Sequence, residues 1–544
     1  MLSQIHSCSL LGIEGQIVTV EIDVLNGLPS YVLVGLPDTG VKESKERVYS
    51  ALKNSGYSYP MKKITINLAP ADLKKEGPAY DLPIALGLLM ASEQLEPVDI
   101  ESYVILGELS LSGEIKPING ILPMVLAARD HGFKKIMIPS ANQYEAAVVE
   151  GIEILPVESV AEAAAHLSGE CCKAPCKVDI DALFKRSSTH NCETDFSEIR
   201  GQEHAKRAFE IAAAGAHNLL LSGPPGAGKS MMAKAFPSIL PDMTVEEALE
   251  VTKIYSVAGL LRDAQVMTER PFRSPHHTIS NISLIGGGRI PKPGEVSLAH
   301  LGVLFLDELP EFKKSALEVL RQPIEDQQVT ISRVSASLTY PASFMMIASM
   351  NPCPCGYYGD PTHECRCSTS EIHRYAGKIS GPLLDRIDIK IEVPAMDFDA
   401  LETAPKGERS ADIKARVNAA RAVQNRRYAK EEGLYFNAQL SPRYIEKYCK
   451  LGLHEKQLME KIYKKMNLSA RGYHRILKLA RTIADLEGAA DINAAHLSEA
   501  VQYRSTEALV LKDNKKVSVQ NNSGRSPFLL HTVNQTGKIL DWHR

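Results

Sequence analysis

The chain has 544 residues, more than one hydrophobic core holds, and at roughly 150 residues per domain we expect three or four domains. Hydrophobic residues make up 44% of the sequence and charged residues 23%, which excludes a mainly disordered or fibrous protein. The formal net charge of -3 argues against a uniformly basic surface for nucleic acid, although it is compatible with a local basic channel.

The sequence pattern shows neither a membrane span nor an export signal. No apolar run reaches the roughly 18 residues that cross a bilayer. The first residues lack the charged lead and apolar stretch of a secretion signal, and the stretch up to Val24 alternates like a strand at 17–24 instead. We therefore expect a cytoplasmic protein with no membrane partner, whose 10 cysteines are thiols or metal ligands rather than disulfides.

Residues 1–168 alternate β-like runs with helices and end in an alanine-rich helix. Strands are expected at 17–24, 31–34, 63–67, 103–107 and 135–138. Helices are expected at 39–55, 81–91, 122–131 and 160–166. Residues 169–195 show little periodicity and are predicted to form a linker.

The remainder of the chain changes pattern twice. Residues 196–395 alternate strand and helix, which is typical of a parallel α/β sheet. Residues 396–505 are helical in pattern and predict a C-terminal lid, and the tail at 506–544 is polar and expected to be disordered. One helical face of the lid carries Ile476, Leu479, Ala480 and Ile483. The predicted fold class is α/β, with an α/β N-terminal domain, a central parallel sheet and a helical C-terminal domain.

A glycine-rich loop follows the apolar strand predicted at 218–222 and precedes a helix at 231–235. The loop has the pattern G-x-x-x-x-G-K-S and consists of Gly223, Pro224, Pro225, Gly226, Ala227, Gly228, Lys229 and Ser230. Its glycines let backbone N–H groups turn toward phosphates, Lys229 places a charge on the β and γ phosphates, and Ser230 is a ligand for Mg²⁺. The sequence therefore predicts a site for ATP with Mg²⁺.

The partner strands of such a site are expected to end in polar residues. An apolar strand at 302–306 ends in Asp307 and Glu308, which would hold Mg²⁺ and activate the attacking water, respectively. Buried carboxylates without a partner are costly, which argues against a purely structural role for this pair. A third strand, at 344–350, ends at Asn351, whose side chain would reach the γ-phosphate or the water.

These motifs resemble those of the AAA+ ATPases. Segments 273–278, 285–295, 301–308 and 382–388 narrow the resemblance to the magnesium-chelatase-like branch. Together with the N-terminal block they resemble the YifB/ComM group of that branch over about residues 1–505, and the tail lies outside the resemblance.

The resemblance implies roles for three residues around the nucleotide. Asn351 matches sensor 1, Arg386 matches the arginine finger that completes a neighbouring subunit's site, and Arg471 matches sensor 2. An arginine acting on a neighbour implies a homo-oligomeric ring, which in this family is typically hexameric. The alternatives are a local salt bridge from Arg386 to Asp385 or Asp388, and an exposed helix-start cation at position 471.

The resemblance also implies two loops that point into the pore of such a ring. Residues 283–295, with Arg289 and Lys292, look like the helix-2 insert, and 329–338, with Arg333, look like the hairpin before sensor 1. Basic pore loops follow a phosphate backbone without reading sequence, which makes DNA the expected partner. Solvated turns with incidental cations are the alternative. In the lid we expect a solvated helix face from Lys414, Arg416, Arg421, Arg426 and Arg427.

Four cysteines cluster directly after the third strand. Cys353, Cys355, Cys365 and Cys367 form C-x-C, nine residues, C-x-C. Four thiolates bind Zn²⁺ tetrahedrally, although C-x-C departs from the usual C-x-x-C spacing, and His363 is a spare ligand candidate. We predict a structural Zn²⁺ site, with four reduced thiols as the alternative. We expect no metal at Cys171, Cys172, Cys176, His276 and His277.

Within the N-terminal block, residues 75–81 and 107–117 resemble the Lon protease domain, which has a ribosomal-S5-like α/β fold. Proteolysis in that family needs a serine nucleophile activated by a lysine. The matching positions hold Ala79 and Met124, so neither half of the dyad is present. We expect a non-proteolytic domain for assembly or substrate contact.

Three functions stay open at this point. The first is a hexameric ATP-driven DNA motor, because motors of the ComM type are implicated in moving branched DNA during uptake and recombination. The second is a chaperone-like ATPase that remodels a protein partner, as metal-chelatase motor subunits do. The third, an ATP-dependent protease, conflicts with the missing dyad.

Overall fold

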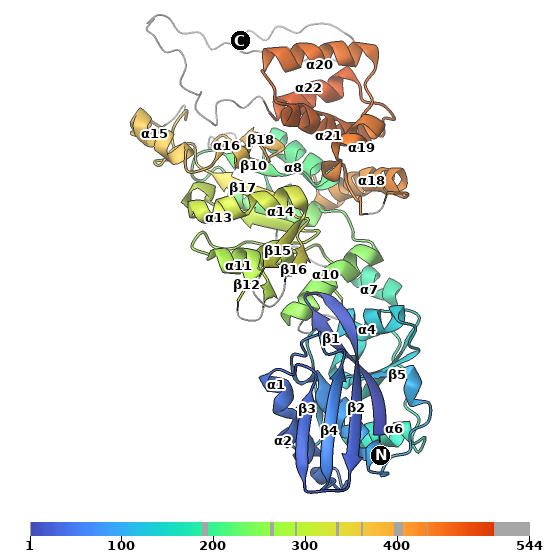
Figure 1. Ribbon diagram of the computed structural model, residues 1–544. Coiled ribbons are helices and arrows are strands. Elements are labelled where there is room, and N and C mark those ends of the chain that lie inside the picture. The colour runs from blue at the N-terminus through green and yellow to red at the C-terminus, as the bar shows by residue number, and fades with distance from the viewer. Residues whose placement is uncertain are drawn as a thin grey trace, which may run out of the picture.

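The computed structural model describes residues 2–187, 194–261, 266–288, 291–332, 337–360, 363–396, 406–431 and 433–504. Figure 1 shows an N-terminal sheet domain, a central sheet domain and a group of C-terminal helices that follow one another along the molecule. This arrangement confirms the predicted α/β fold class with a helical C-terminal region. Among the described residues, no helix is both long and apolar enough to cross a membrane. The predicted tail at 506–544 lies outside the described residues.

A seven-stranded mixed sheet builds the N-terminal part, in the order β3-β4-β2-β1-β5-β8-β9. Its strands are β1 (Leu2–Leu11), β2 (Glu14–Leu25), β3 (Ser30–Val34), β4 (Lys63–Ala69), β5 (Tyr103–Ile105), β8 (Lys135–Pro139) and β9 (Glu153–Val157). The pairs β1–β2 and β2–β4 are antiparallel, and the other neighbours run parallel. A small hairpin joins β6 (Glu108–Leu109) to β7 (Ile115–Lys116). The helices of this part are α1 (Thr39–Lys42), α2 (Ser44–Asn54), α3 (Asp81–Ala91), α4 (Ile121–Asp130), α5 (Gln143–Ala146) and α6 (Val160–Leu167).

The N-terminal hairpin is longer than the sequence predicts. The sequence defines a strand only at 17–24, whereas β1 pairs with β2 along its whole length. The small polar residues Ser7 and Ser9 occupy buried positions of β1, so its alternation of apolar and polar residues is weak. The helix predicted at 39–55 is interrupted at Glu43, between α1 and α2.

The segment predicted to be an irregular linker contains a helix, α7 (Ile180–Ser187). Leu183 packs against the N-terminal core, and Phe184 packs against an apolar cluster around α10 (Val245–Ala258). Upstream, the backbone N–H of Cys176 donates to the carbonyl of Ile154 at 2.8 Å. One or two docking residues hold such a short helix but are too few to make a periodic pattern in the sequence.

A parallel five-stranded sheet forms the central part, in the order β11-β14-β17-β10-β18. Its strands are β10 (Leu219–Ser222), β11 (Phe272–Arg273), β14 (Val303–Leu306), β17 (Met345–Met350) and β18 (Ile389–Glu392). The helices around it are α8 (Glu203–Gly215), α9 (Lys229–Ala235), α10, α11 (Asn281–Ile285), α12 (Glu295–Leu298), α13 (Lys314–Val319), α14 (Arg321–Asp326), α15 (Thr369–Ala376) and α16 (Gly381–Leu384). Because β14, β10 and β17 are parallel neighbours, their carboxyl ends meet at one edge.

Two hairpins extend from the central part: β12 (Gly286–Gly287) with β13 (Lys292–Pro293), and β15 (Gln328–Ser332) with β16 (Ser337–Pro341). The hydroxyl of Tyr340 on β16 donates to the carbonyl of Pro291 at 2.9 Å, which ties the hairpins together. The segments that the sequence assigned to two pore loops therefore lie side by side. Arg289 and Arg333 lie outside the described residues.

The C-terminal part is helical, with α18 (Ser410–Tyr428), α19 (Pro442–Tyr448), α20 (Leu453–Lys465), α21 (Ala470–Leu486) and α22 (Ala494–Gln502). The predicted apolar face of α21 is confirmed, since all four of its residues are buried. They share one hydrophobic core with α8 and β10 of the central part. Within the described residues, short 3-10 turns cover Pro78–Tyr80, Ile100–Ser102, Ser140–Asn142, Phe196–Glu198, Phe236–Ile239, Leu309–Glu311 and Asn437–Gln439.

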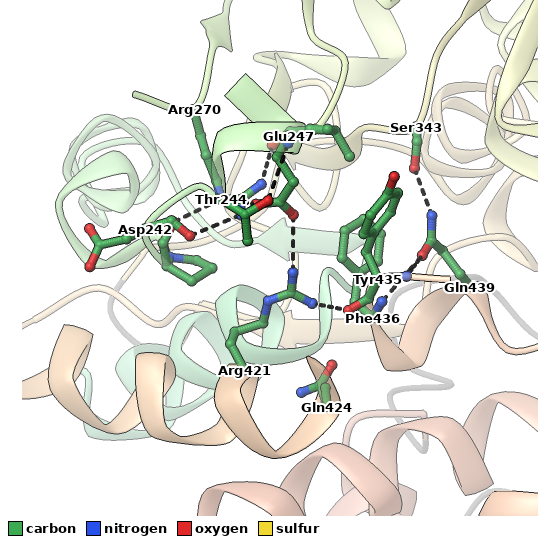
Figure 2. A network of polar contacts seen from close by, with 12 residues as sticks. Asp242, Thr244, Glu247, Arg270, Ser343, Arg421, Gln424, Tyr435, Phe436 and Gln439 are labelled. Carbon is green, nitrogen blue, oxygen red and sulfur yellow. Dashed lines mark hydrogen bonds and ion pairs between the residues drawn. The ribbon is translucent and has the colours of Figure 1, made fainter. Parts of the chain in front are cut away.

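The expectation of a solvated cationic face on α18 is wrong for Arg421 and Arg427, whereas Arg416 and Arg426 are exposed. Figure 2 shows Arg421 directed at Glu247 of α10, which also binds Arg270. All three side chains are at most 7% exposed, so this is a buried ion cluster. Arg427 pairs with the fully buried Asp485 of α21. Lys414 and Arg416 also form ion pairs with other elements, and Arg426 is exposed as predicted. The carboxylates that bury these cations come from distant segments, so α18 alone does not reveal them.

Candidate functional site

The phosphate-binding loop needs glycine for two different reasons: close packing at one position and left-handed backbone conformation at two others. A Cβ atom on Gly223 would lie 2.0 Å from the carbonyl oxygen of Val393, so the loop starts pressed against β18. Gly226 and Gly228 have φ angles of +80° and +83°, and a Cβ on either would meet nothing within 4 Å. These two positions therefore provide the left-handed turns and leave the mouth of the loop free for a ligand. Helix α9 begins at Lys229 with no side-chain cap, as in anion sites at helix N-termini.

Lys229 is the buried cation of this loop. Its Nζ donates to the carbonyl oxygens of Gly223 at 2.7 Å and Pro224 at 2.8 Å, and to Oδ1 of Asn351 at 3.2 Å. Burial lowers the pKa of Lys229, against a smaller opposing effect of the Asp307 carboxylate. Neutral oxygens hold this ammonium group, and a phosphate would satisfy its charge more fully.

Asp307 lies where the loop and the neighbouring strands meet. Ser230 Oγ donates to its Oδ2 at 2.9 Å, and Ser349 Oγ donates to its Oδ1. The backbone N–H of Glu308 also donates to that Oδ1, at 3.1 Å. A hydroxyl and a carboxylate placed side by side form the oxygen pair that Mg²⁺ prefers. Ser349, which orients Asp307 from within β17, is not distinguished by the sequence pattern.

Glu308 differs from Asp307 in exposure and backbone conformation. Its side chain is 58% exposed, and its φ of +53° is unusual for a residue other than glycine. Nδ1 of His277 lies 4.0 Å from its carboxylate. His277 also contacts His276 through their rings, and Nδ1 of His276 lies 2.9 Å from Oγ1 of Thr278. The carboxylate of Glu308 is accessible to a water molecule, which a general base requires.

The predicted nucleotide residues line one cavity of about 350 Å³. Its lining includes the loop from Pro225 to Met231 together with Asp307, Glu308, Ser349 and Asn351. A second cavity of about 390 Å³ shares Glu308 and Asn351 with the first. The structure thus brings together, within one chain, the predicted loop residues from Pro225 to Ser230 with Asp307, Glu308 and Asn351, whereas Gly223 and Pro224 do not line the cavity. They fit a nucleoside triphosphate with its cation, because phosphate donors and metal oxygens face the same space.

The two predicted catalytic arginines do not line that cavity in their own chain. Arg386 forms an ion pair with Glu325 of α14 and donates to the carbonyl of Pro382 at 2.8 Å. Arg471 lies 3.2 Å from the same carboxylate. The expected local alternative for Arg386, a salt bridge to Asp385 or Asp388, is wrong. Asp388 pairs instead with Arg475 at 2.5 Å, and His217 lies 3.5 Å away.

The four clustered cysteines converge in space. The Sγ atoms of Cys353, Cys355, Cys365 and Cys367 all lie within 4.8 Å of one another. Three of the separations are 3.3, 3.6 and 3.7 Å, too long for disulfides. A Zn–S bond of about 2.3 Å places the sulfurs of a tetrahedral site about 3.8 Å apart, so the arrangement fits four-sulfur coordination. The spare candidate His363 stacks on Tyr357 and lies outside this group.

The N-terminal block holds no serine–lysine dyad at the Lon-like positions. Ala79 and Met124 are both buried and apolar. Nearby, Ser110 bonds to Ser112 at 2.8 Å, and Lys116 bonds to Glu114 at 2.8 Å. These polar side chains are thus paired locally rather than with one another as nucleophile and base.

Comparisons with known families and proteins agree with this geometry. The family models described as "Magnesium chelatase, subunit ChlI", "Subunit ChlI of Mg-chelatase" and "Magnesium chelatase, subunit ChlI C-terminal" match residues 195–401, 20–142 and 407–504, respectively. The competence protein ComM of Haemophilus influenzae is 43% identical over 512 residues, which cover 94% of this chain and 99% of that relative. YifB of Escherichia coli is 44% identical over 512 residues, which cover 94% of this chain and 98% of that relative. Lon protease 2 of Bacillus subtilis is 34% identical over 122 residues, which cover 22% of each chain. The chain belongs to the magnesium-chelatase-like ComM/YifB family of AAA+ proteins.

Proposed function

We propose that this protein is an ATP-hydrolysing ring motor that acts on DNA, as a branch-migration helicase in DNA uptake or recombination. The observation that carries the proposal is the convergence of Lys229, Ser230, Asp307, Glu308 and Asn351 on one cavity. The relative from Haemophilus influenzae is named a competence protein, which supports a role in DNA uptake.

Each residue has a separate task in the proposed reaction. Lys229 binds the β and γ phosphates, and Ser230 and Asp307 hold Mg²⁺, which neutralises charge on the phosphate oxygens when bound. Glu308 orients the attacking water and accepts its proton, and Asn351 positions the water or the γ-phosphate. Arg386 and Arg471 supply positive charge to the nucleotide of a neighbouring subunit, which requires a ring, and we propose a hexamer.

DNA is the proposed substrate of the ring. The support for DNA is the pair of adjoining hairpins. Lys292 is exposed on one of them, and in the sequence Arg289 and Arg333 fall between the paired strands of the two hairpins. Cations on such loops bind the phosphate backbone without reading bases. We place the motor in the cytoplasm, where ATP and DNA are both available.

We also propose domain boundaries for the chain and a metal ion for its cysteine group. The matched family segments support a Lon-like, non-proteolytic domain at 1–168, a linker at 169–195, an ATPase core at 196–395 and a lid at 396–505. The cysteine group at 353–367 is proposed to hold a structural Zn²⁺ ion, on the strength of its converging sulfurs.

The test is ATP hydrolysis by the purified protein, alone and with single-stranded, duplex and four-way-junction DNA. We expect strong stimulation by the junction, and we expect Lys292→Ala to reduce it. The matched control is Lys314→Ala, an exposed cation at the start of α13. If no DNA changes the rate of hydrolysis, the result would instead support the alternative, a chaperone-like ATPase that remodels a protein. The magnesium-chelatase family match favours that alternative.

A further inference from the structure

The cysteine loop connects directly to the nucleotide site. It leaves β17 at Asn351, a predicted γ-phosphate residue, and reaches the fully buried Cys353 two positions later. Cys353 then fixes the next turn, because the backbone N–H of Gly356 lies 3.0 Å from its carbonyl oxygen and 3.2 Å from its sulfur. A metal on Cys353 would therefore hold both the chain that follows Asn351 and the turn at Gly356.

That turn rests on the phosphate-binding loop. A Cβ atom on Gly356 would lie 2.5 Å from Cδ and 2.7 Å from Cγ of Pro225, so the backbone at Gly356 packs closely against this proline. Its φ of +90° is a conformation that residues with side chains rarely adopt. At the other end of the phosphate-binding loop, the backbone N–H of Gly223 donates to the carbonyl of Met350 at 3.3 Å. The phosphate-binding loop thus contacts the same segment on two sides.

The cysteine loop needs an additional constraint to keep this position. Between β17 and α15 the described part of the chain has no helix or strand, and residues 361 and 362 lie outside the description. Closing a loop of this length in one conformation costs entropy, and a crosslink within the loop reduces that cost. A metal held by the four sulfurs would fix the loop by linking Cys353 and Cys355 to Cys365 and Cys367.

We propose that a metal ion bound by Cys353, Cys355, Cys365 and Cys367 holds the phosphate-binding loop in its ATP-binding shape through Gly356 and Pro225. The set of four sulfur donors selects Zn²⁺ among abundant divalent ions. ATP affinity then depends on an ion that touches neither the nucleotide nor its Mg²⁺. This inference rests on the proposed ATP-binding function. It makes ATP binding at the same site depend on a second metal ion besides Mg²⁺.

The experiment measures zinc content and ATP binding on the same full-length preparations. Zinc per chain comes from elemental analysis, and the Kd comes from a fluorescent ATP analogue in the presence of Mg²⁺. Wild-type protein should carry about one zinc ion per chain. Cys365→Ser should lose the ion and weaken ATP binding at least about tenfold, because the phosphate-binding loop loses its preorganisation. Cys171→Ser, at an exposed cysteine in the predicted linker, is the control and should change neither quantity.

The Gly356→Ala variant tests the contact between Gly356 and Pro225 without removing the metal. It keeps all four sulfurs and should retain zinc, yet it should weaken ATP binding because its methyl group displaces Pro225. Removing zinc from wild-type protein with a thiol-type chelator that spares Mg²⁺, then adding it back, should weaken and restore ATP binding without any substitution. This reversal distinguishes coupling from a folding defect of Cys365→Ser.

Three results would overturn the inference: wild-type protein without zinc, zinc loss with an unchanged Kd for ATP, or a Gly356→Ala variant that binds ATP normally. If wild-type protein binds ATP in these cases, the proposed ATPase function stands although the coupling fails. Failure of zinc-loaded wild-type protein to bind ATP would instead refute the proposed function, and the coupling with it.

Discussion

Mixing two inactive variants should restore ATP hydrolysis if Arg386 acts on a neighbouring subunit. Lys229→Ala removes the cation that binds phosphate in the loop, and Arg386→Ala removes the proposed finger. Lys229 contacts the loop and Asn351, whereas Arg386 is held by Glu325 and does not line the nucleotide cavity of its own chain. Each variant therefore keeps the half of a shared site that the other lacks.

The recovery can be calculated from the geometry of a ring. Each variant alone should lose a factor of about 10³ or more in turnover, the range for removing an arginine finger. In a random ring of equal parts, half of the sites have an intact loop and half of those face an intact Arg386, so about one quarter are complete. At other ratios the recovered activity should follow x(1 − x), where x is the fraction of one variant. If Arg386 acted within its own chain, no site would be complete.

The assay is steady-state phosphate release after the two variants have been dissociated, mixed and reassembled at a series of ratios. The matched control mixes Lys229→Ala with Glu308→Gln. Both of these residues belong to the loop side of one subunit, so no site should be complete in that mixture. Activity that stays at the weighted sum of the two variants at every ratio would refute the action of Arg386 on a neighbour.

Three further outcomes follow from individual carboxylates. Glu308→Gln should keep ATP bound while turnover falls by about 10²–10⁴, measured by nucleotide binding and phosphate release, and normal turnover would assign the base elsewhere. Glu247→Gln should lower the free energy of unfolding by about 3–5 kcal/mol in denaturant, because two buried guanidinium groups lose their shared counter-ion. The exposed neighbour variant Glu246→Gln should change it by less than about 0.5 kcal/mol, and equal losses would contradict the buried cluster. Burial raises the pKa of Asp388, but Arg475 and His217 outweigh it, so the net pKa lies below the ordinary 3.8. Its stabilising contribution is therefore present above pH 3.8 and is lost as the pH falls through the folded-state pKa. The stability gap between wild type and Asp388→Asn should shrink as the pH falls below 3.8, and a gap that widens there would reverse the sign.

The nucleotide site was predictable because its signal is local. A short apolar strand, a glycine-rich turn and a helix start follow one another within about a dozen positions, and each step has a direct physical cause. Asp307 and Asn351 were predictable for a related reason, because both end apolar strands that a parallel sheet places at one edge. Ser349 was missed because it lies inside β17, where nothing in the strand pattern distinguishes a buried hydroxyl with a partner from one without.

The partners of the buried charges were not predictable. Cations at helical spacing favour a solvated face, yet Arg421 is buried because Glu247 meets it from α10, 174 positions away in the chain. The sequence neighbours of Arg386 include Asp385 and Asp388, whereas the carboxylate that binds it, Glu325, is 61 positions away. Burial of a charge depends on whether the fold supplies a counter-ion, and that information lies in the packing of the elements rather than in either segment.

Glu325 bears on how the two arginines relate to each other. Sequence motifs assign Arg386 and Arg471 to different segments of the chain, but one carboxylate contacts both. Two guanidinium groups that share an anion in the isolated chain can share a phosphate at a subunit boundary, since the γ-phosphate offers several oxygens and more charge than a carboxylate. The side chain of Arg386 is only 10% exposed, so if it acts as the proposed finger it must exchange Glu325 for the phosphate of a neighbouring subunit. Assembly and catalysis would then use the same ion-pair exchange, and hydrolysis would depend on protein concentration as well as on ATP.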